Sequence, residues 1–144
     1  MTTFSNEKSN TVIGVPSPTR PAISKKQIWD GRIISGFAIA FLLMDGVMKL
    51  FKPAVVIEGT VRLGYPESVI IPLGIVLTAC TLLYAFPRTA ILGAILLTGY
   101  LGGAVATHVR VEAVLFNVLF PVMIGALVWG GLWLRDLRVR SLFF

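Results

Sequence analysis

Residues 89–107 form a stretch without a single charged side chain, made of apolar, small and hydroxyl residues. As an α-helix that rises about 1.5 Å per residue, this stretch would be roughly 30 Å long, which is the thickness of a bilayer's hydrocarbon core. Arg88 precedes it, and His108 and Arg110 follow it. The pattern predicts a transmembrane helix whose far end carries the chain's one histidine.

Three further apolar runs have a similar length, at about residues 33–50, 68–86 and 114–134. Hydrophobic residues make up 56% of the 144-residue chain and charged residues 14%, so the chain lacks the polar surface that a soluble domain needs. The sequence therefore predicts an all-α fold, an integral membrane four-helix bundle. It spans residues 29–144 and follows a polar segment, residues 1–28, that we expect to be a disordered cytoplasmic tail.

The links between the runs are short and carry turn signals. Pro53, Gly64 and Pro66 delimit a short amphipathic helix between the first and second spans, which we expect to lie at the membrane interface. Residues 87–88 leave room only for a tight turn, so the second and third spans should be antiparallel neighbours.

The basic residues lie at the ends of the apolar runs. Nine Lys and Arg lie on the side of the two termini and four on the other side, which predicts that both termini are cytoplasmic. This placement accounts for the net charge of +6 as a determinant of topology, and we do not expect a nucleic-acid partner.

Small residues recur on the third span at the spacing of helix-packing motifs. Gly99 and Gly103 form a small-xxx-small pair, and Gly102 belongs to a second row of small residues. Such residues allow close helix contact in lipid, so we expect these three to pack helices within the monomer. A contact in a homo-oligomer is the alternative.

Polar groups gather at the non-cytoplasmic ends of the predicted helices, and seven are candidates for ligand binding. These candidates are Asp45, Lys49, Arg62, Tyr65, Tyr100, His108 and Asn117. Asp45 and Lys49 share a helix face: either they form an ion pair that neutralises both, or Asp45 faces a pocket and orients a ligand or His108. His108 either caps the C-terminal carbonyls of its helix or exchanges protons with a ligand.

The sequence also limits the chemistry that this chain can perform. One histidine and one cysteine, Cys80, provide neither a bis-histidine haem site nor a zinc cluster nor a pair of redox thiols, so we expect no metal site. Any redox role would require electrons from a bound organic carrier or a partner protein. We therefore do not expect a complete redox enzyme, and whether the chain is catalytic stays open.

Four segments carry a resemblance to a known family over residues 31–140. They are FLLMDGVMKLFKP, RLGYPES, PRTAILGAILLTGYLGGAVATHVR and LFPVMIGALVWGGLWLRDLRVR. They resemble the DoxX-like family of small four-helix membrane proteins from bacteria. The wider DoxX group includes membrane subunits of thiosulfate:quinone oxidoreductases and membrane partners of redox-defence proteins.

The resemblance implies a multi-pass protein of the bacterial inner membrane. The function it implies is that of an accessory membrane subunit, an oxidoreductase subunit in a quinone-linked redox system. Its ligand would be a quinone or a lipid-like molecule below the polar rim, with no covalently bound cofactor, and a redox protein would be its partner. The alternative is a non-enzymatic membrane chaperone or assembly factor that acts through helix–helix contacts. A small-solute transporter is a third reading, although four helices without an evident inverted repeat give little room for alternating access.

Overall fold

The computed structural model describes residues 22–142, and every regular element in this part of the chain is helical. The elements are α1 (Lys25–Phe51), α2 (Ala54–Arg62), the 3₁₀ turn η1 (Glu67–Val69), α3 (Ile70–Ala85), α4 (Ala90–Arg110), α5 (Leu115–Arg135) and α6 (Leu137–Ser141). Four stretches are long and apolar enough to cross a membrane: α1, Glu67–Ala85, α4 and α5. The predicted all-α fold with four membrane-spanning helices is confirmed.

The first helix begins earlier than the sequence predicted. α1 starts at Lys25, so residues 25–28, which we assigned to the tail, form its first turn. Gln27 accounts for this start, because its side-chain Oε1 accepts a hydrogen bond of 3.4 Å from the backbone N–H of Ser24 and satisfies one of the free donors at the helix end. The rest of the predicted tail, residues 1–21, lies outside the described residues.

The predicted turn signals mark the ends of the elements. Pro53 precedes the first residue of α2, and Gly64 follows α2 with a φ of 82°, a conformation that glycine adopts without a steric penalty. Between α3 and α4, the Thr89 hydroxyl donates a hydrogen bond of 2.7 Å to the carbonyl of Leu83 and closes the tight turn. As predicted, α3 and α4 are antiparallel neighbours in contact with each other.

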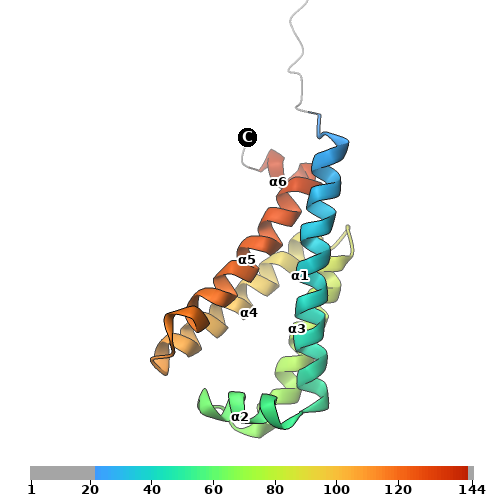
Figure 1. The fold of residues 1–144 in the computed structure, drawn as a ribbon. Helices are drawn as coiled ribbons and strands as arrows, with labels where there is room; N and C mark the ends of the chain where they lie inside the picture. Colours follow the sequence, from blue (N-terminus) through green and yellow to red (C-terminus); the bar gives the residue numbers. More distant parts are fainter. Residues whose placement is uncertain (1–21, 143–144) are drawn as a thin grey trace, which may run out of the picture.

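The four long helices form two pairs that separate toward one end. α1 packs against α3 and α5, and α4 packs against the same two helices. In Figure 1 the α1–α3 pair and the α4–α5 pair meet near the start of α1 and the end of α5 and diverge toward the opposite end, where α2 lies across the end of α1 and α3. We call these the closed end and the open end of the bundle.

Glycines allow the helices to approach closely at the closed end. A Cβ on Gly93 would collide with the backbone of Tyr84 on α3, and a Cβ on Gly131 of α5 would collide with Ser35 on α1. Gly31 lies equally close to α5, where an added Cβ would be 2.8 Å from the Cβ of Leu134. The closed end therefore depends on glycines from three of the long helices.

Tyr84 links the helices at the closed end through its hydroxyl group. This side chain is fully buried, and its hydroxyl donates a hydrogen bond of 2.7 Å to the Val128 carbonyl. Since that bond uses the hydroxyl hydrogen, the Ser35 hydroxyl is the donor in the 3.1 Å contact between the two side chains. Arg135 lies over the Tyr84 ring at 4.9 Å and donates to the carbonyl of Tyr84, the penultimate residue of α3.

The three glycines predicted to pack helices do not do so within the described chain. A Cβ on Gly99, Gly102 or Gly103 would have no heavy atom within 4 Å apart from its own helix and chain neighbours. Gly99 and Gly103 line the space that the separated helix pairs leave between them, and Gly102 is exposed on the surface of α4. The close helix contacts instead involve the glycines of the closed end and, between α1 and α3, Gly46 and Gly74.

Large apolar side chains are exposed along the long helices. Phe37 is 63% exposed in the middle of α1, Leu92 is about half exposed in the first turn of α4, and Val122 is about half exposed near the middle of α5. Lipid tails are as apolar as leucine, so a bilayer solvates such a surface without cost. Together with the spanning lengths, this surface makes the chain a multi-pass membrane protein.

Candidate functional site

A cavity of about 500 Å³ lies among the helices of the open end. α1, α4 and α5 supply most of its wall, α3 contributes Leu73, and the segment from α2 to Tyr65 contributes three side chains. Its size falls within the range of roughly 300–1,000 Å³ that is usual for small-molecule sites. The separation of the helix pairs thus produces a space of ligand size.

The deeper part of the wall is apolar. Phe41 and Leu42 lie on α1 one turn before the charged residues, and Phe120, Pro121 and Ile124 lie on α5. The rings of Phe41 and Phe120 meet edge to face, with 5.3 Å between their centroids, and join α1 to α5. On α4, Gly99 and Gly103 line the cavity, so their missing side chains leave part of its volume free.

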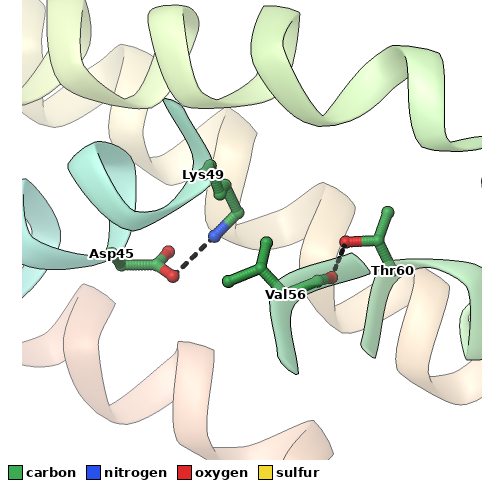
Figure 2. Close-up of polar contacts among 4 residues, drawn as sticks. All are labelled: Asp45, Lys49, Val56 and Thr60. Atoms are coloured by element: carbon green, nitrogen blue, oxygen red, sulfur yellow. Dashed lines mark hydrogen bonds and ion pairs between the residues drawn. The ribbon is translucent and has the colours of Figure 1, made fainter. Parts of the chain in front are cut away.

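Asp45 and Lys49 line the cavity as an ion pair, with 2.6 Å between Lys49 Nζ and Asp45 Oδ1. Figure 2 shows the pair next to α2, where the Thr60 hydroxyl donates a hydrogen bond of 2.8 Å to the Val56 carbonyl. The Lys49 side chain is 17% exposed and that of Asp45 is 40% exposed. The two residues thus neutralise each other, and both line the cavity.

His108 lines the same cavity near the end of α4. Its Nδ1 lies 2.8 Å from the carbonyl oxygen of Ala104, one turn earlier in the same helix. A carbonyl can only accept, so Nδ1 carries the proton and Nε2 keeps a free lone pair in the neutral ring. The Ala104 carbonyl precedes the last four carbonyls of α4, which are the free ones, so this bond is not the expected cap of the helix end. No hydrogen bond or ion pair joins His108 to Asp45 in the described part of the chain, although both reach one cavity.

Two hydrogen bonds attach the segment after α2 to the end of α4. The Tyr65 hydroxyl lies 2.9 Å from Thr107 Oγ1, and Arg110 Nη2 donates a bond of 2.9 Å to the Leu63 carbonyl. The Arg110 guanidinium also lies 5.7 Å from the centre of the Tyr65 ring. Between α1 and α2, Lys52 forms an ion pair of 2.8 Å with Glu67 of η1. The segment is thus fixed as a cover over the open end.

The structure brings five of the seven candidate side chains to one cavity and leaves two outside it. The five are Asp45, Lys49, Tyr65, Tyr100 and His108. Arg62, the last residue of α2, is exposed, and the residue that follows it, Leu63, lines the cavity. Asn117 is exposed in the first turn of α5, one turn before the cavity-lining Phe120.

Thr60 and Thr107 are polar cavity residues that the sequence reasoning did not name. Both occur in helices among apolar neighbours, where threonine is ordinary and carries no signal of its own. Only the position of Thr107 next to His108 could have drawn attention to it. In the part of the chain that the structure describes, no group of three His, Cys, Asp or Glu side chains is arranged to hold a metal ion.

These features define a multi-pass membrane protein with a ligand-sized cavity at one end of a four-helix bundle. The family model described as the DoxX-like family matches residues 33–131, and the chain belongs to this family. Every cavity-lining residue falls within the matched range. No match was found among curated proteins or among solved structures.

Proposed function

We propose that this protein binds a quinone, or a lipid-like molecule with a similar uncharged headgroup, in the open-end cavity. The observation that carries the proposal is the composition of the cavity wall. Apolar side chains line its deeper part, and Asp45, Lys49 and His108 lie toward the end covered by α2. A polar ring attached to an apolar chain is complementary to such a wall.

The charges in the wall favour an uncharged headgroup. Asp45 and Lys49 neutralise each other at 2.6 Å, and the Nδ1 hydrogen of His108 is donated to the Ala104 carbonyl. Arg110 does not line the cavity and binds the Leu63 carbonyl. A phosphate headgroup would therefore enter without a free counter-ion, and burying an unpaired charge is costly. The charges in the wall therefore favour a quinone over a phospholipid.

The proposed role in the cell is that of an accessory membrane subunit in a quinone-linked redox system. This step relies on the resemblance to the wider DoxX group, in which such subunits occur. The bound quinone and a partner protein would carry the electrons, and this chain would hold the carrier in the membrane. Bacterial inner-membrane localisation and cytoplasmic termini belong to the same proposal.

An assembly factor that acts through helix–helix contacts is the second candidate. It is supported by Gly102, which is exposed on α4, has no neighbour within 4 Å of an added Cβ and does not line the cavity. A client helix could approach α4 closely at this position. This function would be lost on Gly102→Leu and retained on Gly103→Leu.

Ligand retention tests the proposal with a matched pair of variants. Gly102 and Gly103 are adjacent, and both have open space around an added Cβ, but only Gly103 lines the cavity. We expect Gly103→Leu to fill part of the cavity and reduce co-purified ligand at least about tenfold, the effect of losing about 1.4 kcal/mol of binding energy. Gly102→Leu should retain the wild-type amount.

The measurement is native mass spectrometry of the detergent-purified protein, followed by extraction and identification of the released molecule. A quinone or similar neutral amphiphile in the wild type and in Gly102→Leu, but not in Gly103→Leu, supports the proposal. Equal retention by all three proteins, or bound molecules limited to phospholipids, would contradict it.

A further inference from the structure

Some donors and acceptors in the wall of the open-end cavity are not used by bonds within the protein. A quinone carbonyl needs only donors, but the unused groups include acceptors as well. Each polar side chain in the wall has a fixed number of donor hydrogens and acceptor lone pairs. Bonds within the protein use some of them, and the remainder is available to a ligand. This remainder can be counted from the contacts, and it specifies the ligand's headgroup more closely than cavity shape does.

Three wall residues use their hydrogens on backbone carbonyls. The hydroxyl of Thr60 donates to Val56, the hydroxyl of Thr107 donates to Gly103, and Nδ1 of His108 donates to Ala104, each at 2.8 Å and one turn back in its own helix. Thr60 Oγ1 and His108 Nε2 are then left with lone pairs only.

The hydroxyl hydrogen of Tyr65 is also used in a hydrogen bond within the protein. Its hydroxyl lies 2.9 Å from Thr107 Oγ1, and the single hydroxyl hydrogen of Thr107 is already directed at the Gly103 carbonyl. Tyr65 is therefore the donor in this contact, and its oxygen keeps only acceptor capacity. Asp45 is an acceptor as well, because a carboxylate has no hydrogen and Lys49 occupies only one of its oxygens.

Two of the wall residues keep hydrogens that they can donate to a ligand. Lys49 has two ammonium hydrogens beyond the one that it gives to Asp45, and the Tyr100 hydroxyl has no hydrogen-bond partner among the described residues. The wall thus offers acceptors on Asp45, Thr60, Tyr65 and His108, and donors on Lys49 and Tyr100. A complementary headgroup must donate hydrogen bonds as well as accept them.

We infer that the cavity selects a ring with hydroxyl groups, the dihydroxy form of a quinone-like amphiphile, over the corresponding dione. A dione can only accept, so it would leave the acceptors of Asp45 and His108 unmatched in a space from which it displaces water. A site that is built to bind a hydroxyl group rejects an analogue that lacks it, because the site's own polar groups are then left without partners. This inference rests on the proposed ligand binding and names the form that is bound.

The test compares decylubiquinol with decylubiquinone, which share their substituents and tail and differ in the two hydroxyl groups. The full-length chain in detergent micelles is titrated with each compound in anaerobic buffer by isothermal titration calorimetry. The heat measured with Gly103→Leu is subtracted as partition into the micelle. We expect the Kd for the diol to be at least about tenfold lower than the Kd for the dione.

Two variants test whether the preference for the diol comes from acceptors in the cavity wall. His108→Phe keeps a ring of similar shape but removes the Nε2 acceptor, and Thr60→Val removes the hydroxyl oxygen at nearly constant shape. Either variant should weaken diol binding several-fold and leave dione binding unchanged, so the preference becomes smaller. Thr60 lies on α2, outside the spanning helices, so Thr60→Val serves as the test if His108→Phe does not fold.

The outcomes separate this inference from the proposed function. Saturable binding of both compounds with equal Kd, or tighter binding of the dione, would overturn the inference and leave ligand binding intact. A preference for the diol that both variants leave unchanged would also overturn it. Heats for the wild type that equal those for Gly103→Leu with both compounds would overturn the inference and the binding of a quinone-like ligand together.

Discussion

Gly93→Ala is expected to destabilise the protein by about 1–3 kcal/mol, although alanine is the better helix former. The added Cβ would collide with backbone atoms of Tyr84 and Leu83 on α3. A backbone cannot move aside as a flexible side chain can, so α3 and α4 would have to separate. That shift would also displace the Tyr84 hydroxyl from Ser35 and the Val128 carbonyl, which it joins across the closed end.

Thermal unfolding in detergent, followed by circular dichroism, measures this effect as a lower Tm. Gly102→Ala is the matched control, because it places the same Cβ on the same helix with nothing within 4 Å. The control should leave the Tm unchanged or raise it slightly, since a glycine inside a helix costs about 0.5–1 kcal/mol relative to alanine. Equal Tm values for the two variants would show that the closed end does not depend on close helix contact.

The second large effect concerns the ion pair in the cavity wall. Asp45→Leu should destabilise the protein by roughly 2 kcal/mol, because it leaves the Lys49 ammonium, on a side chain that is only 17% exposed, without its partner. The double variant Asp45→Leu/Lys49→Met removes both charges. We expect it to regain most or all of the lost stability, because a pair of charges in an apolar surrounding adds little net stability over apolar side chains.

A double-mutant cycle measures this coupling from the free energies of unfolding of the wild type, both single variants and the double variant. A coupling energy of about 1–3 kcal/mol is the expected result. Strictly additive effects of the two single substitutions would contradict an ion pair between these residues. The double variant also serves ligand studies, since it should fold while lacking both charged groups of the wall.

The spanning helices and their order could be predicted because hydrocarbon length and backbone hydrogen bonding leave few alternatives. A run such as residues 89–107 has to become a helix of spanning length, and Pro53 and Gly64 indicate the limits of α2 before any tertiary contact is known. The side chains of the site could be assigned to one end of the bundle by the same reasoning. Asp45 and His108 therefore were expected at a common depth, and they do line one cavity.

The rotation of each helix about its axis could not be predicted. In water, polarity distinguishes the exposed face of a helix from the buried one, but lipid solvates leucine as well as a protein interior does. On α3, Ile75 is exposed and Leu77 is fully buried, and nothing in their chemistry separates them. The same ambiguity explains why Gly99 and Gly103 were assigned to helix packing rather than to the cavity wall. Arg62 and Asn117 were included in the site because they lie at the same end of the bundle, but depth alone does not show which way a side chain faces.

Photoaffinity labelling tests the central claim most directly, namely that a neutral amphiphile occupies the open-end cavity. A decyl-tailed benzoquinol with a diazirine on its tail is photolysed with the full-length protein in nanodiscs, and the labelled residues are identified by peptide mass spectrometry. We predict labels on Phe41, Leu101 and Phe120, which line the cavity, that disappear with excess decylubiquinol and in Gly103→Leu. Labels spread over the exposed faces, at residues such as Ile75 and Val122, and unaffected by the competitor or the variant would contradict the account.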